Sequence, residues 1–370
     1  MTGEPTRRTK AYGRPSDGRL LLGLLAFFCL LLFLRNAEIA LRACAEGLRL
    51  CAVTVIPALF PCLVLSEVVV SSGVGARLLR PVARPLSGLF RLPPEGACAM
   101  LLGMLCGAPI GARAAVSAYD RGAMTREQTE RIVAVSTCPS AAFLLGAVGT
   151  SMHGDRRYGV VLLAVTLATA LLLAVLTARS AANDGDLAAP RASAPRLPKG
   201  GALRLLTDAV GQARTAMLNV TAYVVFFSVF CTTLASCAAQ WGLPAPIRAA
   251  LFCLFELSNG ASAAAALSDP TCSTFLTALA VGWSGLSVHG QVLSVCEGCG
   301  LRTGRYLARK ALHGLMTAAV FTAVLRLCPS LSHETVSTIP AVAQAAGIPV
   351  ATVCFLLSLP LFRRKRPRGV

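Results

Sequence analysis

Several long apolar runs without a single charged residue constrain this chain more than any other feature of its sequence. They cover Leu20–Leu34, Val160–Ala178, Ala216–Gln240 and Ile339–Leu361. A helix of about 20 apolar residues crosses the ~30 Å hydrocarbon core of a bilayer. Only 14% of all residues are charged, whereas a soluble domain carries about 25%. The sequence therefore predicts an all-α polytopic protein of the lipid bilayer.

Two of the apolar segments are interrupted by helix-breaking residues. Segment 96–118 contains Cys106–Gly111, and segment 247–267 contains Glu256–Gly260. Glycine and proline break helices, so each segment is expected to form a re-entrant hairpin buried in protein or facing a water-filled cavity. With them, about eight transmembrane helices are expected from the segments near 20–40, 48–72, 132–152, 159–178, 216–240, 273–297, 311–328 and 339–361.

The distribution of basic residues predicts the orientation. With a cytoplasmic N-terminus and two hairpins that return to their own side, 27 of the 35 lysines and arginines lie inside and six outside. This is the asymmetry of cytoplasmic loops. It predicts a multi-pass protein of the cell membrane with both termini cytoplasmic. The net charge of +18 comes without a nucleic-acid-binding motif, so no nucleic acid partner is expected.

The N-terminus and the cysteines allow other interpretations. A basic stretch, an apolar run and Ala43-Cys44-Ala45 resemble a signal peptide, but an uncleaved first span is preferred because many spans follow. Most of the 15 cysteines lie in apolar runs, where they act as small hydrophobes. Cys296 and Cys299 form a CxxC without two further ligands at zinc spacing. No metal and no cofactor are expected.

The order of segments divides the chain into two similar halves. Residues 48–178 and 216–328 each contain a span, a hairpin, a broken span and a further span, and a cytoplasmic linker, 179–215, separates them. Residues 1–47 add a basic N-terminus and a first span, and 329–370 add a last span and a basic tail. The two hairpins enter from opposite sides, which is typical of the inverted repeats of secondary transporters.

Four short motifs at the breaks are the candidate binding elements. They are Gly107–Arg113, Ser136–Ser140, Glu256–Gly260 and Gly282–Gln291. Unwound helices expose N–H and C=O groups that bind anions, cations or hydroxyls. The candidate solute-binding residues are Gly107, Pro109, Gly111, Cys138, Ser140, Glu256, Asn259, Gly260, Ser284, Gly285, Ser287, His289 and Gln291.

Glu256 stands out because a carboxylate inside an apolar segment is costly unless it is paired or hydrated. It could bind a solute hydroxyl or amine, or carry a coupling proton. Two structural alternatives remain open. In one, Glu256 caps the tip of its hairpin. In the other, it forms an ion pair with Arg113.

The stretch Gly282–Gly285 also matches the GxSG motif of intramembrane serine proteases. A serine nucleophile then needs a histidine base on another helix, and His313 could supply it. The match is short for a glycine-rich membrane protein, and the corresponding Ser136–Ser140 of the first half lacks it. No enzymatic activity is expected.

Five motifs resemble the sporulation integral membrane proteins that carry a nucleoside-recognition, or Gate, domain. The resemblance extends over about residues 50–325, and its motifs are Cys106–Ala112, Gly122–Gln128, Phe143–Gly149, Glu256–Gly260 and Ser284–Gln291. Ala108 replaces a tyrosine of that family, and Thr137–Ala141 replaces its Asn-x-Ser-Gly-Pro stretch. Gate domains are similar to the core of concentrative nucleoside transporters, so the resemblance implies a transport-like fold and a role in spore formation.

These observations predict a transporter or channel-like protein that moves a small polar solute through a site at the membrane midplane. Without a nucleotide-binding motif, movement would be passive or driven by a gradient. The alternative is a non-transporting scaffold that binds sporulation partners during formation of the spore envelope. A transporter requires water-accessible polar groups at the breaks, whereas a scaffold requires a dry core.

Overall fold

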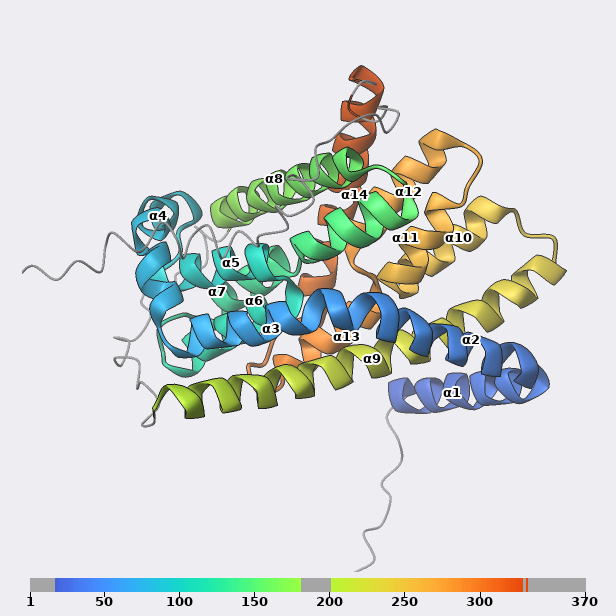
Figure 1. Cartoon of the computed structure of the whole chain (residues 1–370), viewed down its shortest axis with the longest axis horizontal. Helices are drawn as coiled ribbons and strands as arrows, with labels where there is room; N and C mark the ends of the chain where they lie inside the picture. Colours follow the sequence, from blue (N-terminus) through green and yellow to red (C-terminus); the bar gives the residue numbers. More distant parts are fainter. Residues whose placement is uncertain (1–16, 181–200, 329–330, 332–370) are drawn as a thin grey trace, which may run out of the picture.

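The computed structural model describes residues 17–180, 201–328 and 331, and every regular element in these ranges is a helix (Figure 1). Two of the elements, η1 and η2, are π-helical. The helices are α1 (Asp17–Arg35), α2 (Ala37–Leu50), η1 (Cys51–Val55), α3 (Ile56–Ser71), α4 (Val74–Phe90), α5 (Pro94–Cys106), α6 (Ala108–Asp120), α7 (Arg126–Ser136), η2 (Phe143–Met152), α8 (Arg156–Ser180), α9 (Ala202–Gln240), α10 (Ala245–Phe255), α11 (Leu257–Ala265), α12 (Pro270–Trp283), α13 (Gly285–Val295) and α14 (Thr303–Leu327).

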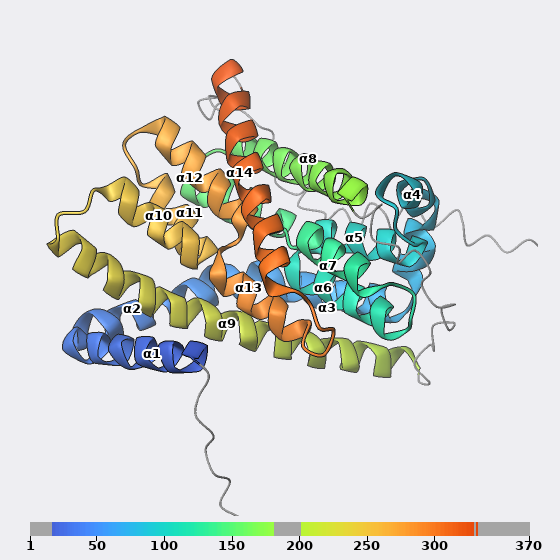
Figure 2. The same cartoon turned by 180° about the vertical axis from the view of Figure 1, so that it is seen from behind.

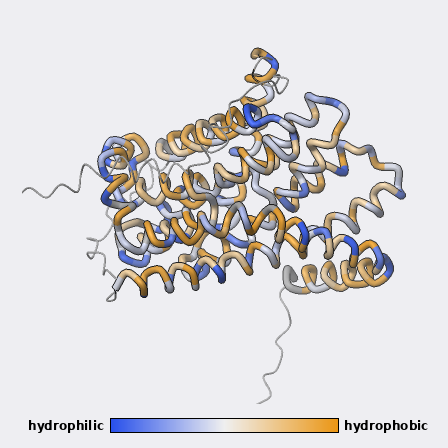
Figure 3. The backbone as a smooth tube through the Cα atoms, in the orientation of Figure 1, coloured by the Kyte–Doolittle hydropathy of each residue, from blue (hydrophilic) through white to orange (hydrophobic). Residues whose placement is uncertain are grey.

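The described helices are those of a polytopic membrane protein, which confirms the predicted fold class. Four stretches are long and apolar enough to cross a bilayer, namely α8, α9, α12 with α13, and α14. Two bent pairs raise this number to six if each pair is one span: α1 with α2, bent by 98°, and α4 with α5, bent by 106°. The expected span 339–361 lies outside the described residues. Apolar positions follow the long helices in Figure 3, where lipid would surround them.

The break predicted inside segment 96–118 is confirmed at Gly107, which separates α5 from α6. Its φ of +97° is open to glycine but strained for other residues. A Cβ atom on Gly103 would lie 2.7 Å from the Cα of Gly111. In a continuous helix, residues eight apart lie about 12 Å apart. The chain therefore folds back on itself, and α5 and α6 pack side by side.

The break predicted inside segment 247–267 is confirmed at Glu256, which separates α10 from α11. A Cβ atom on Gly260 would lie 2.6 Å from the Cα of Cys253, so this segment also folds back. Both helix–break–helix units are therefore real elements of the fold.

Each half also contains the expected broken span. In the first half, α7 ends at Ser136, and residues 137–140 are not helical before the chain enters η2. In the second half, α12 ends at Trp283, and the next residue, Ser284, has a left-handed φ of +76°. Ser284 is one of two described non-glycine residues with positive φ, so its backbone is strained.

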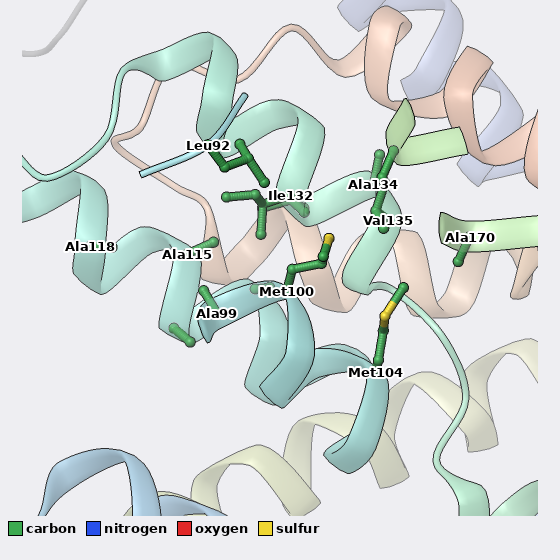
Figure 4. Close-up of a cluster of buried hydrophobic side chains, with 14 of the residues drawn as sticks. Leu92, Ala99, Met100, Met104, Ala115, Ala118, Ile132, Ala134, Val135 and Ala170 are labelled. Carbon is green, nitrogen blue, oxygen red and sulfur yellow. The ribbon is translucent and has the colours of Figure 1, made fainter. Parts of the chain in front are cut away.

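Small and apolar side chains let the helices pack closely. Figure 4 shows Met100 and Met104 of α5 in one cluster with Ala115 of α6 and with Ile132 and Val135 of α7. A second cluster contains buried side chains of η2, α8, α10, α11, α12 and α14. The two clusters together hold the hairpins against the broken spans. Helix packing in lipid relies on such close contacts, because burial from water does not drive it there.

The interface between α12 and α14 shows how close these contacts are. A Cβ atom on Gly282 would lie 2.8 Å from the Cα of Gly314. Figure 2 shows α14 passing beside α12, α13 and α7, and it packs against α12, α8 and α7. This helix therefore contacts both halves of the chain.

Two stretches differ from the segments expected from the sequence. Residues 74–90, counted as part of a cytoplasmic loop, form helix α4, and its arginines recur at helical spacing. Helix α9 begins at Ala202, inside the expected linker 179–215. Of that linker, residues 181–200 lie outside the described residues.

Candidate functional site

The two breaks of the second half pack directly on each other. A Cβ atom on Gly285 would lie 3.0 Å from the Cα of Glu256. The indole Nε1 of Trp283 donates a hydrogen bond of 2.9 Å to the carbonyl oxygen of Leu254. The end of α10 therefore lies against the end of α12, and the predicted residues Glu256, Ser284 and Gly285 come together.

The carboxylate of Glu256 caps helix α11. It is 2% exposed and accepts hydrogen bonds from the backbone N–H of Ser258 (3.0 Å) and Asn259 (2.7 Å). A carboxylate at this position neutralises the unpaired N–H groups and the positive end of the helix. The capping alternative is therefore confirmed. The alternative of an ion pair with Arg113 does not hold in the structure, where Arg113 lies 3.5 Å from Glu67 instead.

The neighbouring polar residues hold the second hairpin to the rest of the protein. Asn259 donates a hydrogen bond of 2.8 Å to Ser228 Oγ of α9. On α13, the amide of Gln291 lies 3.5 Å from Ser287 Oγ. The structure thus places Asn259 toward α9, and Ser287 and Gln291 one helical turn apart along α13.

The first half repeats this contact between its two breaks. A Cβ atom on Gly107 would lie 3.3 Å from the Cβ of Ser140, and Gly111 packs on Ser136. Pro109 lies in the first turn of α6, where its missing N–H costs nothing. Cys138 is buried in the unwound segment. The predicted residues of this half therefore form a second group.

His289 lies deep between α12 and α14. Its Nδ1 atom is 2.9 Å from the hydroxyl of Tyr306, and its ring packs edge-on against Trp283, with 4.3 Å between the ring centroids. Only 2% of the residue is exposed. His289 thus connects the second-half break to α14.

Two buried polar residues that the sequence analysis leaves out of the candidate site lie between the two groups. Lys310 precedes the predicted span 311–328, and His313 enters the sequence argument only as a candidate protease base, but both are fully buried in α14. The Nζ atom of Lys310 donates a hydrogen bond of 2.6 Å to the carbonyl of Thr137. The Nδ1 atom of His313 lies 3.0 Å from the carbonyl of Gly282. Their spacing of three residues on one helix face was the available signal.

The protease interpretation requires a bond between Ser284 and His313. Ser284 Oγ instead donates to the carbonyl of Val281 at 3.3 Å. The Nε2 atom of His313 lies 3.2 Å from the carbonyl of Thr166. These partners differ from a nucleophile and its base.

A cavity of about 630 Å³ lies between α12 and α14, near the N-terminal end of α12. It is mostly apolar and contains none of the predicted site residues. Its lining consists of Asp269, Thr271, Cys272, Phe275, Ala319, Thr322, Ala323, Arg326 and Leu327. Among the described residues, no group of three or more histidines, cysteines or acidic residues is arranged to hold a metal ion.

Comparison with known proteins identifies one informative relative. No family model matches the chain, and no solved structure matches it significantly. The chain is 25% identical over 347 residues to the sporulation integral membrane protein YlbJ of Bacillus subtilis (strain 168), a match that covers 83% of this chain and 82% of the relative. This match supports the predicted resemblance to sporulation integral membrane proteins; it says nothing of a nucleoside-recognition domain. The chain is a multi-pass helical membrane protein that is similar to a sporulation integral membrane protein of Bacillus subtilis.

Proposed function

We propose that this protein moves a small polar solute across a membrane of the sporulating cell, through a site formed by the four helix breaks. The observation that carries the proposal is their pairing. Gly107 packs on Ser140 in one half, Gly285 packs on Glu256 in the other, and buried polar groups of α14 contact the break of each half.

The energetic cost of this arrangement supports a functional role. Unwound backbone and buried charges are unfavourable at membrane depth, where water does not satisfy them. Transporters place such breaks at the midplane, where half-helix ends bind solute and ions. Glu256 is the carboxylate within these motifs, so it is the proposed solute-binding or ion-binding group.

The repeated order of elements supports an inverted repeat as part of this proposal. In each half a folded-back helix pair is followed by a broken span and then by a long helix, α8 or α14. Two inverted halves that rock against each other provide alternating access to a central site. The Gate-domain resemblance favours the same mechanism.

A scaffold in spore envelope formation is the second candidate, and it is favoured by the burial of Glu256, by a cavity that contains none of the predicted site residues, and by the bonds of the carboxylate. Both carboxylate oxygens of Glu256 already accept backbone hydrogen bonds, as in a purely structural cap. In that case sporulation partners would bind at the surface, and the core at the breaks would stay dry. No enzymatic activity belongs to either proposal.

The native Cys138 provides a direct test of water access. The full-length protein in membranes is treated with a small cationic methanethiosulfonate, and each labelled cysteine is identified by peptide mass spectrometry. Exposed Cys328 is the positive control, and buried Cys51 is the negative control. Transport predicts that Cys138 reacts well above the level of Cys51. Labelling of Cys138 at the level of Cys51 would reject the transport pathway and favour the scaffold.

A further inference from the structure

The buried ammonium group of Lys310 has neutral partners. Its Nζ atom donates to the carbonyl of Thr137 and lies 3.1 Å from His313 Nδ1. None of the ion pairs within the described residues joins Lys310 to a carboxylate. A lysine that is buried in a spanning helix without a counter-charge is costly. It therefore calls for a role beyond packing.

The surroundings of His313 restrict the number of protons that it can share with Lys310. The carbonyl oxygens of Gly282 and Thr166 lie next to Nδ1 and Nε2, respectively. A carbonyl oxygen only accepts, so both carbonyls favour a ring with two N–H groups. Lys310 lies beside the same Nδ1 atom and, when charged, favours a ring nitrogen without hydrogen. Both demands cannot be met at once.

We infer that Lys310 and His313 bind one exchangeable proton between them, and that this proton is the ion that drives the proposed transport. In one form Lys310 is an ammonium and His313 is neutral, with its hydrogen on Nε2. In the other form the proton has moved to Nδ1, so that Lys310 is a neutral amine and His313 is an imidazolium. A second added proton would place two positive charges 3.1 Å apart, which is unfavourable in a buried site.

The described groups around Lys310 and His313 include no acidic side chain that would neutralise their shared proton. Near the end of α7 lies the thiol of Cys138, α13 contributes His289, and α14 itself contributes Tyr306. From α8 and α12, the atoms in contact with the ring are backbone carbonyls, which do not titrate. None of these neighbours is a carboxylate, so no acidic side chain among them neutralises the charge of the pair.

The position of the pair connects its proton to movement of the two halves. A hydrogen bond from a charged donor is roughly twice as strong as one between neutral groups. Loss of the shared proton leaves Lys310 neutral and weakens its bond to Thr137, which holds α14 to the first-half break. His313 keeps its contacts with Gly282 of the second half and with Thr166 of α8 in the first half. Deprotonation should therefore loosen the first-half break at residues 137–140 from α14, which is a local change of the kind that alternating access uses.

The first experiment examines the proton itself. The full-length protein, labelled with ¹⁵N in its histidine rings, is studied in lipid nanodiscs by solid-state NMR between pH 6 and pH 9. The His313 signals are assigned by their loss in His313→Gln. In the wild type, the population of rings with two N–H groups should fall as the pH rises, because only the form with the shared proton on Nδ1 has two. In Lys310→Arg this change should disappear, because arginine keeps its charge at every pH tested. Arg305→Gln, an exposed charge change on the same helix, should leave it intact.

Lys310→Met provides a second arm that does not depend on how arginine fits. It removes the charge, so Nδ1 should carry a permanent hydrogen that is donated to Gly282. Identical His313 spectra in the wild type, Lys310→Arg and Lys310→Met would overturn the shared proton.

The second experiment examines coupling, which rests on the proposed transport function. Hydrogen–deuterium exchange of peptides covering residues 137–140 is compared between the wild type and Lys310→Arg at the same pH. At pH 8 the wild type should exchange at least about threefold faster, and at pH 6 the two should agree. Equal exchange at both values would reject the coupling. A shared proton seen by NMR together with unreactive Cys138 would instead reject transport and retain the proton site.

Discussion

The contact between the two second-half breaks predicts a specific effect of Gly285→Ala. Gly285 has φ +75°, and an added Cβ atom would lie 3.0 Å from both the Cα of Glu256 and the N of Leu257. Gly242 is the matched control, because it has φ +74° and no heavy atom within 4 Å of the added Cβ position. Both alanine variants must hold a left-handed backbone, which costs about 1–2 kcal/mol. The Gly242→Ala control should lose only this conformational contribution to the free energy of unfolding.

Gly285→Ala should lose more, because the neighbouring atoms belong to the backbone of the hairpin tip and cannot rotate away. Forcing extra volume into a packed site costs about 1–3 kcal/mol. Each kcal/mol lowers the midpoint by about 2–4 °C in domains of 150–250 residues. For this longer chain, we expect Gly285→Ala to melt about 2–6 °C below Gly242→Ala.

A thermal melt in detergent measures this difference with a fluorophore that reacts with cysteines as they become exposed. The chain suits the method because several of its cysteines are buried. Equal midpoints for Gly285→Ala and Gly242→Ala would refute the packing of the two breaks, whatever the absolute loss. The comparison cancels the conformational cost, so it reports the contact alone.

Three further predictions concern the carboxylate, the topology and the repeat. Glu256→Gln should abolish function while membrane insertion stays normal, and the loss should appear as failed spore maturation in the native host. Glu297→Gln changes an exposed carboxylate and is the control. Normal spores from the Glu256→Gln strain would remove the case for a functional carboxylate. Reporter fusions at residues 190 and 370 should both signal a cytoplasmic location, and an external signal from either would reject the charge-based orientation. In an experimental structure, the two repeat regions should superpose after a rotation of about 180° around an axis in the membrane plane. Hairpin segments that both cross the bilayer completely would contradict that relation.

The sequence predicted the breaks well because each one is caused by local residues. Gly107 and Pro109 interrupt an apolar segment, and Glu256 does the same in the second half. Glycine and proline disrupt a helix through their own backbone chemistry, and the carboxylate of Glu256 favours the start of a new helix, whose free N–H groups it caps. The structure places both breaks at these positions.

Long-range partners could not be predicted in the same way. Arg113 pairs with Glu67, and Lys310 is buried against Thr137, although both contacts join distant parts of the chain. Counting charges assigns a lysine near a helix end to the loop, because hydropathy measures the average of a segment and not the direction of one side chain. Helix α4 was missed for a related reason, since its arginines lower the mean hydropathy of an amphipathic helix.

The close approach of Gly282 to Gly314 determines where the second half can bend. At this contact the backbones of α12 and α14 touch without a side chain between Gly282 and Gly314. The two helices therefore cannot tilt closer together or slide past each other without a backbone clash. We therefore expect α12 and α14 to move together as one rigid body. The strained residue Ser284 follows α12 and precedes α13, so we expect the angle between these two helices to change there. Movement of α14 would then change the direction of α13 at Ser284, next to Glu256.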